Sequence, residues 1–448
     1  MGKLTPSRMV ILSFLSAICL GTIALSLPIA THKPGGLSFI ASLFTATSAT
    51  CVTGLVVQNT GTYFTTFGRW VIFVLFQSGG LGIMTFSTLF AVVLGRRIGL
   101  NQSETVSSTL YDQNRIGLKR LMCYILGITF AVEAIGATLL YFRWRVLTDW
   151  TFWQTVEASI FHSVSGFCNA GFALFSTSFI QFRGDAIINS TMIALIVIGG
   201  IGFVVIMDVI GLFFKKGPER KISLQAKVAL TASLVLIVAG ALVLFFVEKD
   251  GVLKGMPMIE RVWTSVFQSV TARTTGFNTL PIGELAVPSL VFLMLLMFIG
   301  ASPGSTGGGI KTCTIVVICA TIWNMLKNRR RVMIFGRSIP KRVIRESLII
   351  FFLSVAWIFV MVLAVTYLRT QNVGGDISLV RLMFEIFSAF GTVGLSTGIT
   401  ENLDNASELC IIATMFAGRI GPLTLALAIA FRERGERYIF PEENIMVG

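Results

Sequence analysis

Four short segments, spread along the whole chain, share an order of residue types that could bind a cation. Each has a hydroxyl residue, a short run, a glycine and an apolar residue. The segments are Ser48 to Leu55, Ser165 to Phe172, Thr271 to Phe277 and Ser388 to Leu395. The hydroxyl residue precedes the glycine by six positions in three copies and by five in the third. The glycines are 117, 105 and 118 positions apart, which predicts a fourfold internal repeat.

The chemistry would be done by backbone carbonyls. Glycine accepts a positive φ and lets strands approach closely, so four such loops can meet on one axis and replace the hydration shell of a cation. Thr392-Val393-Gly394 opens like a potassium-filter signature, although the tripeptide alone is a weak signal. Simple helix caps are the alternative for any single glycine. The predicted ion-binding residues are Cys51, Val52, Thr53, Gly54, Cys168, Asn169, Ala170, Gly171, Thr274, Thr275, Gly276, Thr392, Val393 and Gly394.

The composition places these loops in a membrane protein. Hydrophobic residues make up 54% of the 448 residues and charged residues only 13%, and the mean hydropathy is +0.81. Apolar stretches long enough to span a bilayer recur from end to end. With seven cysteines in no metal-like spacing and two histidines, neither a disulfide framework nor a metal cluster is predicted. The N-terminal apolar run is predicted to be the first span rather than a signal peptide.

The elements that must position the loops follow one plan. Each repeat is predicted to hold a spanning helix, a short re-entrant pore helix, the glycine loop and a second spanning helix. The fold class is therefore an all-α polytopic membrane protein with eight transmembrane helices around a pseudo-fourfold pore. The predicted repeats are 1–95, 96–215, 216–326 and 327–448, the last including a C-terminal tail. The second spans are predicted at 70–94, 187–214, 287–323 (interrupted) and 407–431.

The distribution of basic residues predicts the orientation. Most of the 36 lysines and arginines lie at the N-terminus, in the tail and in the connections 96–120, 215–227 and 327–345. The positive-inside rule makes these segments and both termini cytoplasmic and turns the glycine loops outward. The net charge of +14 therefore indicates anionic membrane lipid and a cytoplasmic protein partner rather than nucleic acid.

Glycine and proline break the predicted second span of repeat 3 and indicate a gate. Their density in this stretch excludes a stable helix interior, so we expect a flexible loop beneath the glycine loops, or else a packed kink. Nucleotide binding fails on spacing, because Ile310 separates Gly309 from Lys311. The predicted gate residues are Gly300, Ala301, Ser302, Pro303, Gly304, Ser305, Thr306, Gly307, Gly308, Gly309, Lys311 and Arg419.

Charged residues inside apolar spans are candidates for function. We expect Arg419 to hold the barrier closed by its charge and by hydrogen bonds to loop carbonyls. Lys311 either acts similarly or extends toward the cytoplasm. Arg273 braces the loops or tunes permeation. Three carboxylates are ion ligands or structurally paired groups, namely Glu133, Asp208 and Glu385.

The chain as a whole resembles a known family. It is similar over essentially its whole length to the membrane subunit (KtrB/KtrD-like) of Ktr-type potassium uptake systems, in the Trk/Ktr/HKT superfamily. The resemblance implies that Gly54, Gly171, Gly276 and Gly394 are the four filter glycines, and that a glycine at the first position goes with potassium permeability. It also implies an intramembrane gating loop. Two departures are Cys51, where related filters often have threonine, and the shorter third loop.

The resemblance further implies partners. It predicts a homodimer in the bacterial plasma membrane, resting on a cytoplasmic ring of nucleotide-binding regulatory subunits (KtrA/KtrC-like). Nucleotide would then act only through that partner, and no covalent cofactor is expected. K⁺ is the transported ion at the filter residues, and the sequence leaves sodium cotransport open.

Two other classes of function compete. An intramembrane protease would need Ser302, Ser305, His162 and Asp208 to form a catalytic constellation, but no Gly-x-Ser-x-Gly elbow is present. A secondary transporter of another cation or small solute is the stronger alternative, because broken helices and repeats also mark that class. Four parallel repeats favour an axial pore, and the resemblance to Ktr-type systems implies that its function is potassium uptake and not an enzymatic reaction.

Overall fold

The computed structural model describes residues 6–33, 35–82, 118–214, 222–372 and 378–429. Helices dominate this part of the chain, and its named strands are the two short strands of one hairpin, β1 (Met333–Ile334) and β2 (Arg337–Ser338). Residues 83–117 and 430–448, which include the predicted boundary at 95 and the tail, lie outside the described residues. So does the boundary at 215, and the predicted repeat limits therefore stay predictions.

The helices follow one order four times. Long helices come first, namely α1 (Pro6–Ser26), α7 (Leu118–Leu147), α11 (Leu224–Val247) and α15 (Lys341–Asn372). Shorter pore helices follow, namely α2 (Phe39–Thr50), α8 (Phe152–Cys168), α12 (Met258–Thr271) and α16 (Leu379–Gly391). In the described residues, two further helices follow each glycine loop. In the first two repeats they are α3 (Thr60–Tyr63) with α4 (Thr66–Gly80), and α9 (Ala186–Ile201) with α10 (Phe203–Phe214). In the last two they are α13 (Val287–Phe298) with α14 (Thr312–Leu326), and α17 (Asn405–Ile420) with α18 (Pro422–Ile429). Short 3₁₀ turns lie between them, namely η1 (Pro28–Ala30), η2 (Ile180–Phe182), η4 (Ile282–Glu284) and η5 (Thr400–Asn402).

Local sequence explains where the first two pore helices begin. Ser38 accepts a hydrogen bond from the backbone of Ala41 at the start of α2. Thr151 and Gln154 form a reciprocal capping box at the start of α8. These caps satisfy N–H groups that a helix end leaves unpaired, so each helix starts at a defined residue before its glycine loop.

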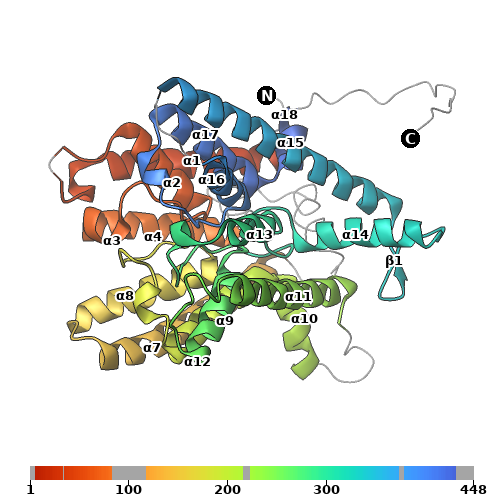
Figure 1. Ribbon diagram of the computed structural model, residues 1–448, viewed down its shortest axis with the longest axis horizontal. Helices are drawn as coiled ribbons and strands as arrows, with labels where there is room; N and C mark the ends of the chain where they lie inside the picture. Colours follow the sequence, from red (N-terminus) through yellow and green to blue (C-terminus); the bar gives the residue numbers. More distant parts are fainter. Residues whose placement is uncertain (1–5, 34, 83–117, 215–221, 373–377, 430–448) are drawn as a thin grey trace.

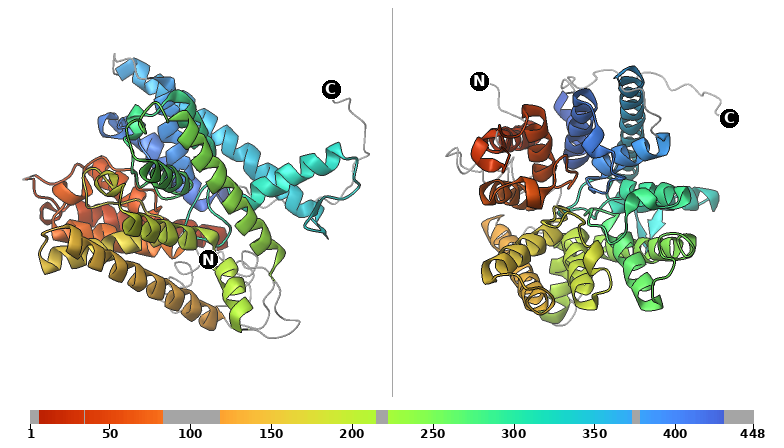
Figure 2. Two further views of the ribbon diagram at one scale, coloured as in Figure 1. Left: turned by 60° about the horizontal axis from the view of Figure 1, so that its bottom comes forward. Right: turned by 60° about the vertical axis from the view of Figure 1, so that its left-hand side comes forward.

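The four groups of helices form a closed ring. In chain order α4 packs against α8, α9 against α12, and α13 against α16, while α17 returns to pack against α2. Figure 1 shows the groups in their sequence colours, and the right-hand view of Figure 2 shows them arranged around central loops. The pore helices therefore all bring their C-terminal ends toward the middle of the ring.

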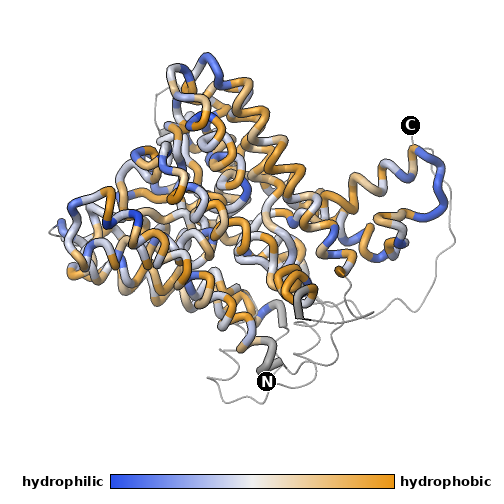
Figure 3. The backbone as a smooth tube through the Cα atoms, turned by 90° about the horizontal axis from the view of Figure 1, so that it is seen from below, coloured by the Kyte–Doolittle hydropathy of each residue, from blue (hydrophilic) through white to orange (hydrophobic). Residues whose placement is uncertain are grey.

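The first helix of each group is the continuous membrane span. Four described helices are long and apolar enough to cross a bilayer by themselves, namely Arg8–Ser26, Met122–Leu147, Leu224–Val247 and Lys341–Thr370. Their outer faces expose large apolar side chains such as Leu20, Phe142, Leu234 and Phe359. Figure 3 shows the long helices mostly orange, with blue residues gathered toward chain turns and helix ends. This is the surface that a helix presents to lipid.

The second helices differ from the sequence prediction. A continuous span over 187–214 is wrong, because the chain bends by 103° between α9 and α10 at Gly202, which has a φ of 100°. The span over 407–431 is likewise interrupted at Gly421, with a φ of 89° before Pro422. The interruption predicted in 287–323 is present between α13 and α14. Hydropathy averages over a span and therefore hides a single glycine at which the helix ends.

Candidate functional site

The four predicted glycines lie together at the centre of the ring, although they are far apart in sequence. All four have positive φ values, of 84°, 70°, 87° and 92° in chain order. A side-chain Cβ placed on any one of them would meet a backbone carbonyl of the next repeat. The pairs are Gly54 with Ala170, Gly171 with Thr275, Gly276 with Val393, and Gly394 with Thr53. The series closes on itself, so repeats 1 and 3 face each other across the ring, as do repeats 2 and 4.

A cavity of about 160 Å³ opens on one side of this ring. Its walls include all four glycines and the segments that follow them, with polar residues such as Asn59, Ser178 and Asn278. Glu401 is the ionisable residue among the residues that line this cavity. The glycine ring therefore has a polar mouth into which a hydrated ion could enter.

Hydroxyl residues of the pore helices hold three of the four glycine loops (51–55, 168–172, 274–277 and 391–395), the exception being 274–277. The Ser48 hydroxyl donates to the carbonyl of Leu55 at 2.7 Å, and the Ser165 hydroxyl donates to the carbonyl of Phe172 at 2.9 Å. Ser388 accepts from the backbone N–H of Gly394 at 3.1 Å. The sequence pattern contained these residues, but the prediction did not include them in the site. Their regular spacing from the glycines was the signal.

The third loop is built differently, as its shorter sequence requires. In the other loops the residue two before the glycine has a left-handed conformation, namely Val52, Asn169 and Thr392, with φ values of 58°, 59° and 48°. No residue in 272–275 has a positive φ, so the missing residue corresponds to this turn. The hydroxyl of Thr271 is buried without a hydrogen-bond partner. Thr275 lies 2.7 Å from the Asn169 side chain instead, so the third loop is held by repeat 2.

The intramembrane loop (300–309) lies directly against the bases of the glycine loops. The Asn169 side chain is also 2.7 Å from the Thr306 hydroxyl, so it bridges a glycine loop and the intramembrane loop. The backbone N–H of Gly308 donates to the Thr392 hydroxyl at 3.1 Å. A Cβ on Gly307 would meet the side chain of Thr274. Three of the four glycine loops thus contact residues 306–308.

Hydrogen bonds to other repeats hold the intramembrane loop in place. The Ser302 and Thr306 backbone N–H groups donate to carbonyls of Gly200 and Gly199 in α9. The Gly304 carbonyl accepts from Phe203, the first residue of α10. On the opposite side Gly309 donates to the Gly418 carbonyl of α17 at 3.3 Å. The predicted loop is present, but hydrogen bonds at several residues hold it in one conformation, whereas the sequence predicted a flexible loop.

A buried cation, Arg419, and a partly buried one, Lys311, contact the same loop. The Arg419 guanidinium donates to the carbonyl of Thr306 and to the carbonyl of Gly79 in α4, so it joins the loop to repeats 1 and 4. The Lys311 ammonium donates to the Gly307 carbonyl at 2.6 Å. Neither side chain extends away from the loop. This geometry is the one that the loop-holding hypothesis for Arg419 requires.

Comparison with known proteins shows which family this chain belongs to. Residues 7–437 match the TrkH family, described as cation transport protein. The chain belongs to the TrkH family. It is 38% identical to the Ktr system potassium uptake protein B of Bacillus subtilis, over 100% of this chain and 97% of that protein. It is 34% identical to the potassium/sodium uptake protein NtpJ of Enterococcus hirae, over 100% and 98% of the two chains.

A solved structure confirms the fold. The potassium transporter TrkH from Vibrio parahaemolyticus superposes with a TM-score of 0.69 at 20% sequence identity, covering 93% of this chain and 84% of that one. The predicted all-α, pseudo-fourfold membrane fold and the predicted Trk/Ktr membership are therefore confirmed. A family of cation transport proteins is not a family of enzymes, so the protease hypothesis is dropped.

The residues of the protease hypothesis are engaged elsewhere in this TrkH-family chain. His162 contacts backbone atoms of Ala158 and Leu174. The Ser305 hydroxyl donates to the Ser302 carbonyl, and Asp208 accepts from the backbone of Ser223. Within the described residues no group of three or more His, Cys, Asp and Glu side chains could hold a metal ion.

The other charged residues singled out in the sequence, Glu133, Arg273 and Glu385, have hydrogen-bond partners. Glu133 on α7 accepts from Gln77 at 3.1 Å, and Gln77 in turn accepts from the Cys168 thiol at 3.0 Å. Arg273 donates to the Ser233 hydroxyl of α11 at 3.2 Å. Glu385 accepts hydrogen bonds from the chain that follows its own glycine loop. These partners are all uncharged groups, and the choice between ion ligand and structural carboxylate for Glu133 and Glu385 stays a prediction.

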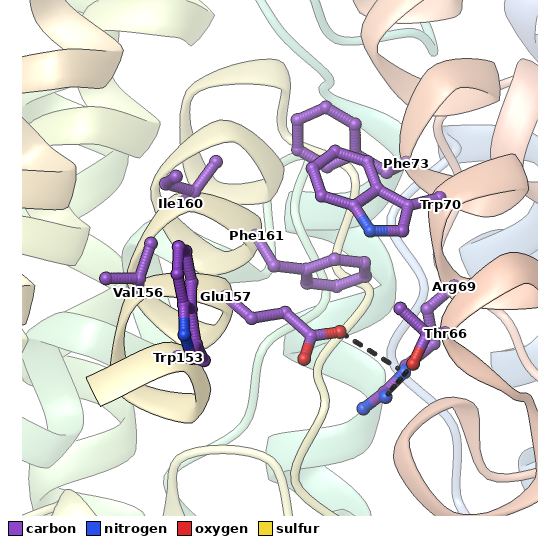
Figure 4. A pocket seen from close by; sticks show the side chains of 9 residues that line it. All are labelled: Thr66, Arg69, Trp70, Phe73, Trp153, Val156, Glu157, Ile160 and Phe161. Carbon is purple, nitrogen blue, oxygen red and sulfur yellow. Dashed lines mark hydrogen bonds and ion pairs between the residues drawn. The ribbon is translucent and has the colours of Figure 1, made fainter. Parts of the chain in front are cut away.

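A larger cavity, of about 360 Å³, lies in the outer wall and not on the central axis. Its lining comes from α4 and α8, with Trp70, Phe73 and Trp153 around an ion pair. Figure 4 shows this pair, in which Arg69 and Glu157 approach to 3.3 Å. The pair joins repeats 1 and 2. No predicted site residue lines this cavity.

Proposed function

We propose that this protein takes up potassium ions across the plasma membrane through the ring of four glycine loops. The head-to-tail closeness of the four glycines to carbonyls of neighbouring repeats carries the proposal. Carbonyl oxygens gathered in this way can replace the water around a cation, and the pore-helix C-termini that lead into the loops favour positive charge. The ligands would come from the predicted residues of the four loops, from Cys51 to Gly394.

The intramembrane loop (300–309) is the proposed gate. It lies at the base of the glycine loops, on the ion path between the ring and the cytoplasm. Arg419, Lys311 and the Asn169–Thr306 contact hold it there in this structure. Opening would require these hydrogen bonds to break together. Breaking several hydrogen bonds at once costs more free energy than a thermal fluctuation supplies, so opening needs a conformational change driven from elsewhere in the protein.

The basic connections supply the proposed site of regulation. With cytoplasmic termini, the connection between α14 and α15 is also cytoplasmic, and it exposes Arg329, Arg330, Arg331 and Arg337. We propose that a cytoplasmic nucleotide-binding subunit binds here and that two copies of this chain form a homodimer. The relative named as part of a Ktr system supports such an assembly. Anionic lipid is the proposed counterpart of the remaining basic residues.

Sodium is the second candidate ion, for one specific reason. The similar protein of Enterococcus hirae is named a potassium/sodium uptake protein. Either sodium accompanies potassium, or the pathway carries another cation. Uptake of each ion must therefore be measured separately.

The test is potassium uptake in a bacterial host that lacks its own uptake systems. We expect wild-type protein to restore uptake, Gly54→Ser to reduce the preference for potassium, and shortening of the 300–309 loop to make uptake less controlled. Equal expression is checked by immunoblot. If well-expressed wild-type protein moves no potassium, the solute-transporter alternative replaces this proposal.

A further inference from the structure

One position of the pore helices is polar and buried in all four repeats. It lies three residues before the hydroxyl residue of each glycine segment, and its occupants are Thr45, His162, Gln268 and Glu385. A pore helix that packs among apolar helices has no general need for a polar side chain at this depth. Such a group is retained at low cost only where it has a hydrogen-bond partner.

In repeats 2 and 4 this side chain makes the same backbone contact. The N–H of Leu174 donates to Nε2 of His162 at 3.1 Å, and the N–H of Thr397 donates to Oε1 of Glu385 at 2.8 Å. Leu174 and Thr397 each lie three residues after the glycine of their loop. Two different residue types therefore hold the chain at an equivalent point, immediately beyond the ring.

The surroundings of His162 define its hydrogen-bonding form. Its Nδ1 lies 2.7 Å from the carbonyl of Ala158, which can only accept. With Nε2 accepting from Leu174, the ring must be neutral and carry its hydrogen on Nδ1. Phe175 stacks on the ring with centroids 4.4 Å apart, and Trp144 meets its edge. The ring is locked in one orientation.

Glu385 holds a longer stretch. Besides the Thr397 backbone, its carboxylate accepts from the hydroxyls of Ser396 at 2.8 Å, Thr397 at 3.2 Å and Thr400 at 2.7 Å. Glu385 therefore fastens residues 396–400 to the pore helix through several hydrogen bonds. Ser396 itself lines the cavity at the mouth of the ring.

The equivalent side chains of repeats 1 and 3 make no such contact. Thr45 donates to the Ala41 carbonyl of its own helix at 2.9 Å. Both amide atoms of Gln268 are buried without a hydrogen-bond partner. The contact is therefore restricted to one diagonal of the ring, since repeats 2 and 4 face each other across it.

We propose that His162 and Glu385 are positioning residues that hold the outer end of the ion-binding ring at two opposite points and so set its discrimination between potassium and sodium. The inference rests on the proposed function. Neither side chain reaches the ion, and both act through the backbone after the glycine. If that backbone is released, the carbonyls can close around a smaller ion, and the preference for potassium falls.

The experiment compares four leucine or valine variants in the same uptake assay, with potassium and sodium uptake measured separately by flame photometry. We expect His162→Leu and Glu385→Leu each to lower the ratio of potassium to sodium uptake about tenfold, the factor that loss of a buried hydrogen bond can produce. Thr45→Val and Gln268→Leu are the matched controls and should leave the ratio within about twofold. His162→Gln and Glu385→Gln, which keep an acceptor, should restore most of it.

Each outcome decides the proposal. An unchanged ratio in folded His162→Leu and Glu385→Leu proteins overturns it, as does an equal loss in the two controls. If the leucine variants fail to accumulate, His162→Asn and Glu385→Asp replace them, because these polar side chains are too short to reach the same backbone. An unchanged ratio there also overturns it. Absence of potassium uptake by wild-type protein would instead overturn the proposed function.

Discussion

The glycine loops and the intramembrane loop (300–309) are both irregular backbone at membrane depth, but they are held by different parts of the molecule. Ser48, Ser165 and Ser388 hold three glycine loops from the pore helix that precedes each one. The intramembrane loop depends mainly on other repeats, through α9, α17 and Arg419. Its remaining backbone bonds are at its ends, such as that from Gly300 to Ile310.

The difference indicates separate roles for the two regions. Bonds within one repeat survive when the repeats shift relative to each other, so the three glycine loops held by Ser48, Ser165 and Ser388 can keep their shape. Bonds between repeats break in such a shift, so the intramembrane loop can be released. An ion path with a constant binding ring and a movable barrier needs this division. The predictions below test it, from the largest expected effect to the smallest.

The largest effect is expected at the glycine ring. Gly394→Ala should reduce potassium uptake at least about 100-fold. Gly394 has a φ of 92°, and a Cβ at this position would meet the Thr53 carbonyl of repeat 1. Gly398→Ala is the matched control, since Gly398 has a φ of 91° but open space around it. Uptake rates at equal expression measure both. Equal losses would mean that backbone strain, and not closeness to the next repeat, is the cause.

Release of the intramembrane loop should come next. Arg419→Ala should raise basal potassium uptake about tenfold, because it removes the hydrogen bonds to the Thr306 and Gly79 carbonyls. Lys311→Met, which removes one bond to Gly307, should raise uptake less, by about threefold. The measurement is uptake without any regulatory partner. Unchanged basal uptake in folded Arg419→Ala protein contradicts the proposed gate.

An increase smaller than that for Arg419→Ala is expected from loss of one hydroxyl of the loop. Thr306→Val should raise basal uptake about fivefold, because the Thr306 hydroxyl lies within hydrogen-bond distance of Asn169 and of the carbonyls of Phe167 and Gly199. Ser305→Ala serves as the comparison, because the Ser305 hydroxyl bonds only to Ser302 within the loop. If both variants behave alike, bonds to other repeats are not what holds the loop.

The smallest effect concerns the hydroxyl residues of the pore helices. Ser165→Ala should cost about 1 kcal/mol of stability, seen as a lower thermal unfolding midpoint in detergent, because the Phe172 carbonyl loses its donor. Thr271→Val should leave the midpoint unchanged or raise it, since the Thr271 hydroxyl has no partner to lose. A lower midpoint in Thr271→Val would show that its hydroxyl is satisfied after all.

Much of the fold could be predicted from the sequence. The predicted order of long helix, short pore helix, glycine loop and second helix recurs four times in the structure, because the length of an apolar stretch and the conformation of glycine are local properties. The breaks at Gly202 and Gly421 were missed, since a glycine inside an apolar span is usually tolerated. Phe203 donates to Gly304 at one of these breaks, and only the folded chain supplies that partner.

The candidate site was predicted unevenly for the same reason. Glycines at a regular spacing pointed to a ring, and an arginine in an apolar span pointed to the loop it contacts. Gln77 was missed, because a single buried polar residue has no pattern of its own, and His162 was considered only for the protease alternative. Their partners, Leu174 and Glu133, are recognisable only once the helices have packed.

The sequence by itself determined that this is a membrane protein of four repeats, each with a short helix leading to a glycine, because hydropathy, capping and glycine conformation are local properties. Only the tertiary structure decided which carbonyl faces each glycine, where the second helices break, and how the intramembrane loop is pinned. Many of the contacts behind those features join residues 100 or more positions apart, such as Asn169 and Thr306. No local pattern encodes such a contact, because its free energy exists only when both repeats are in place.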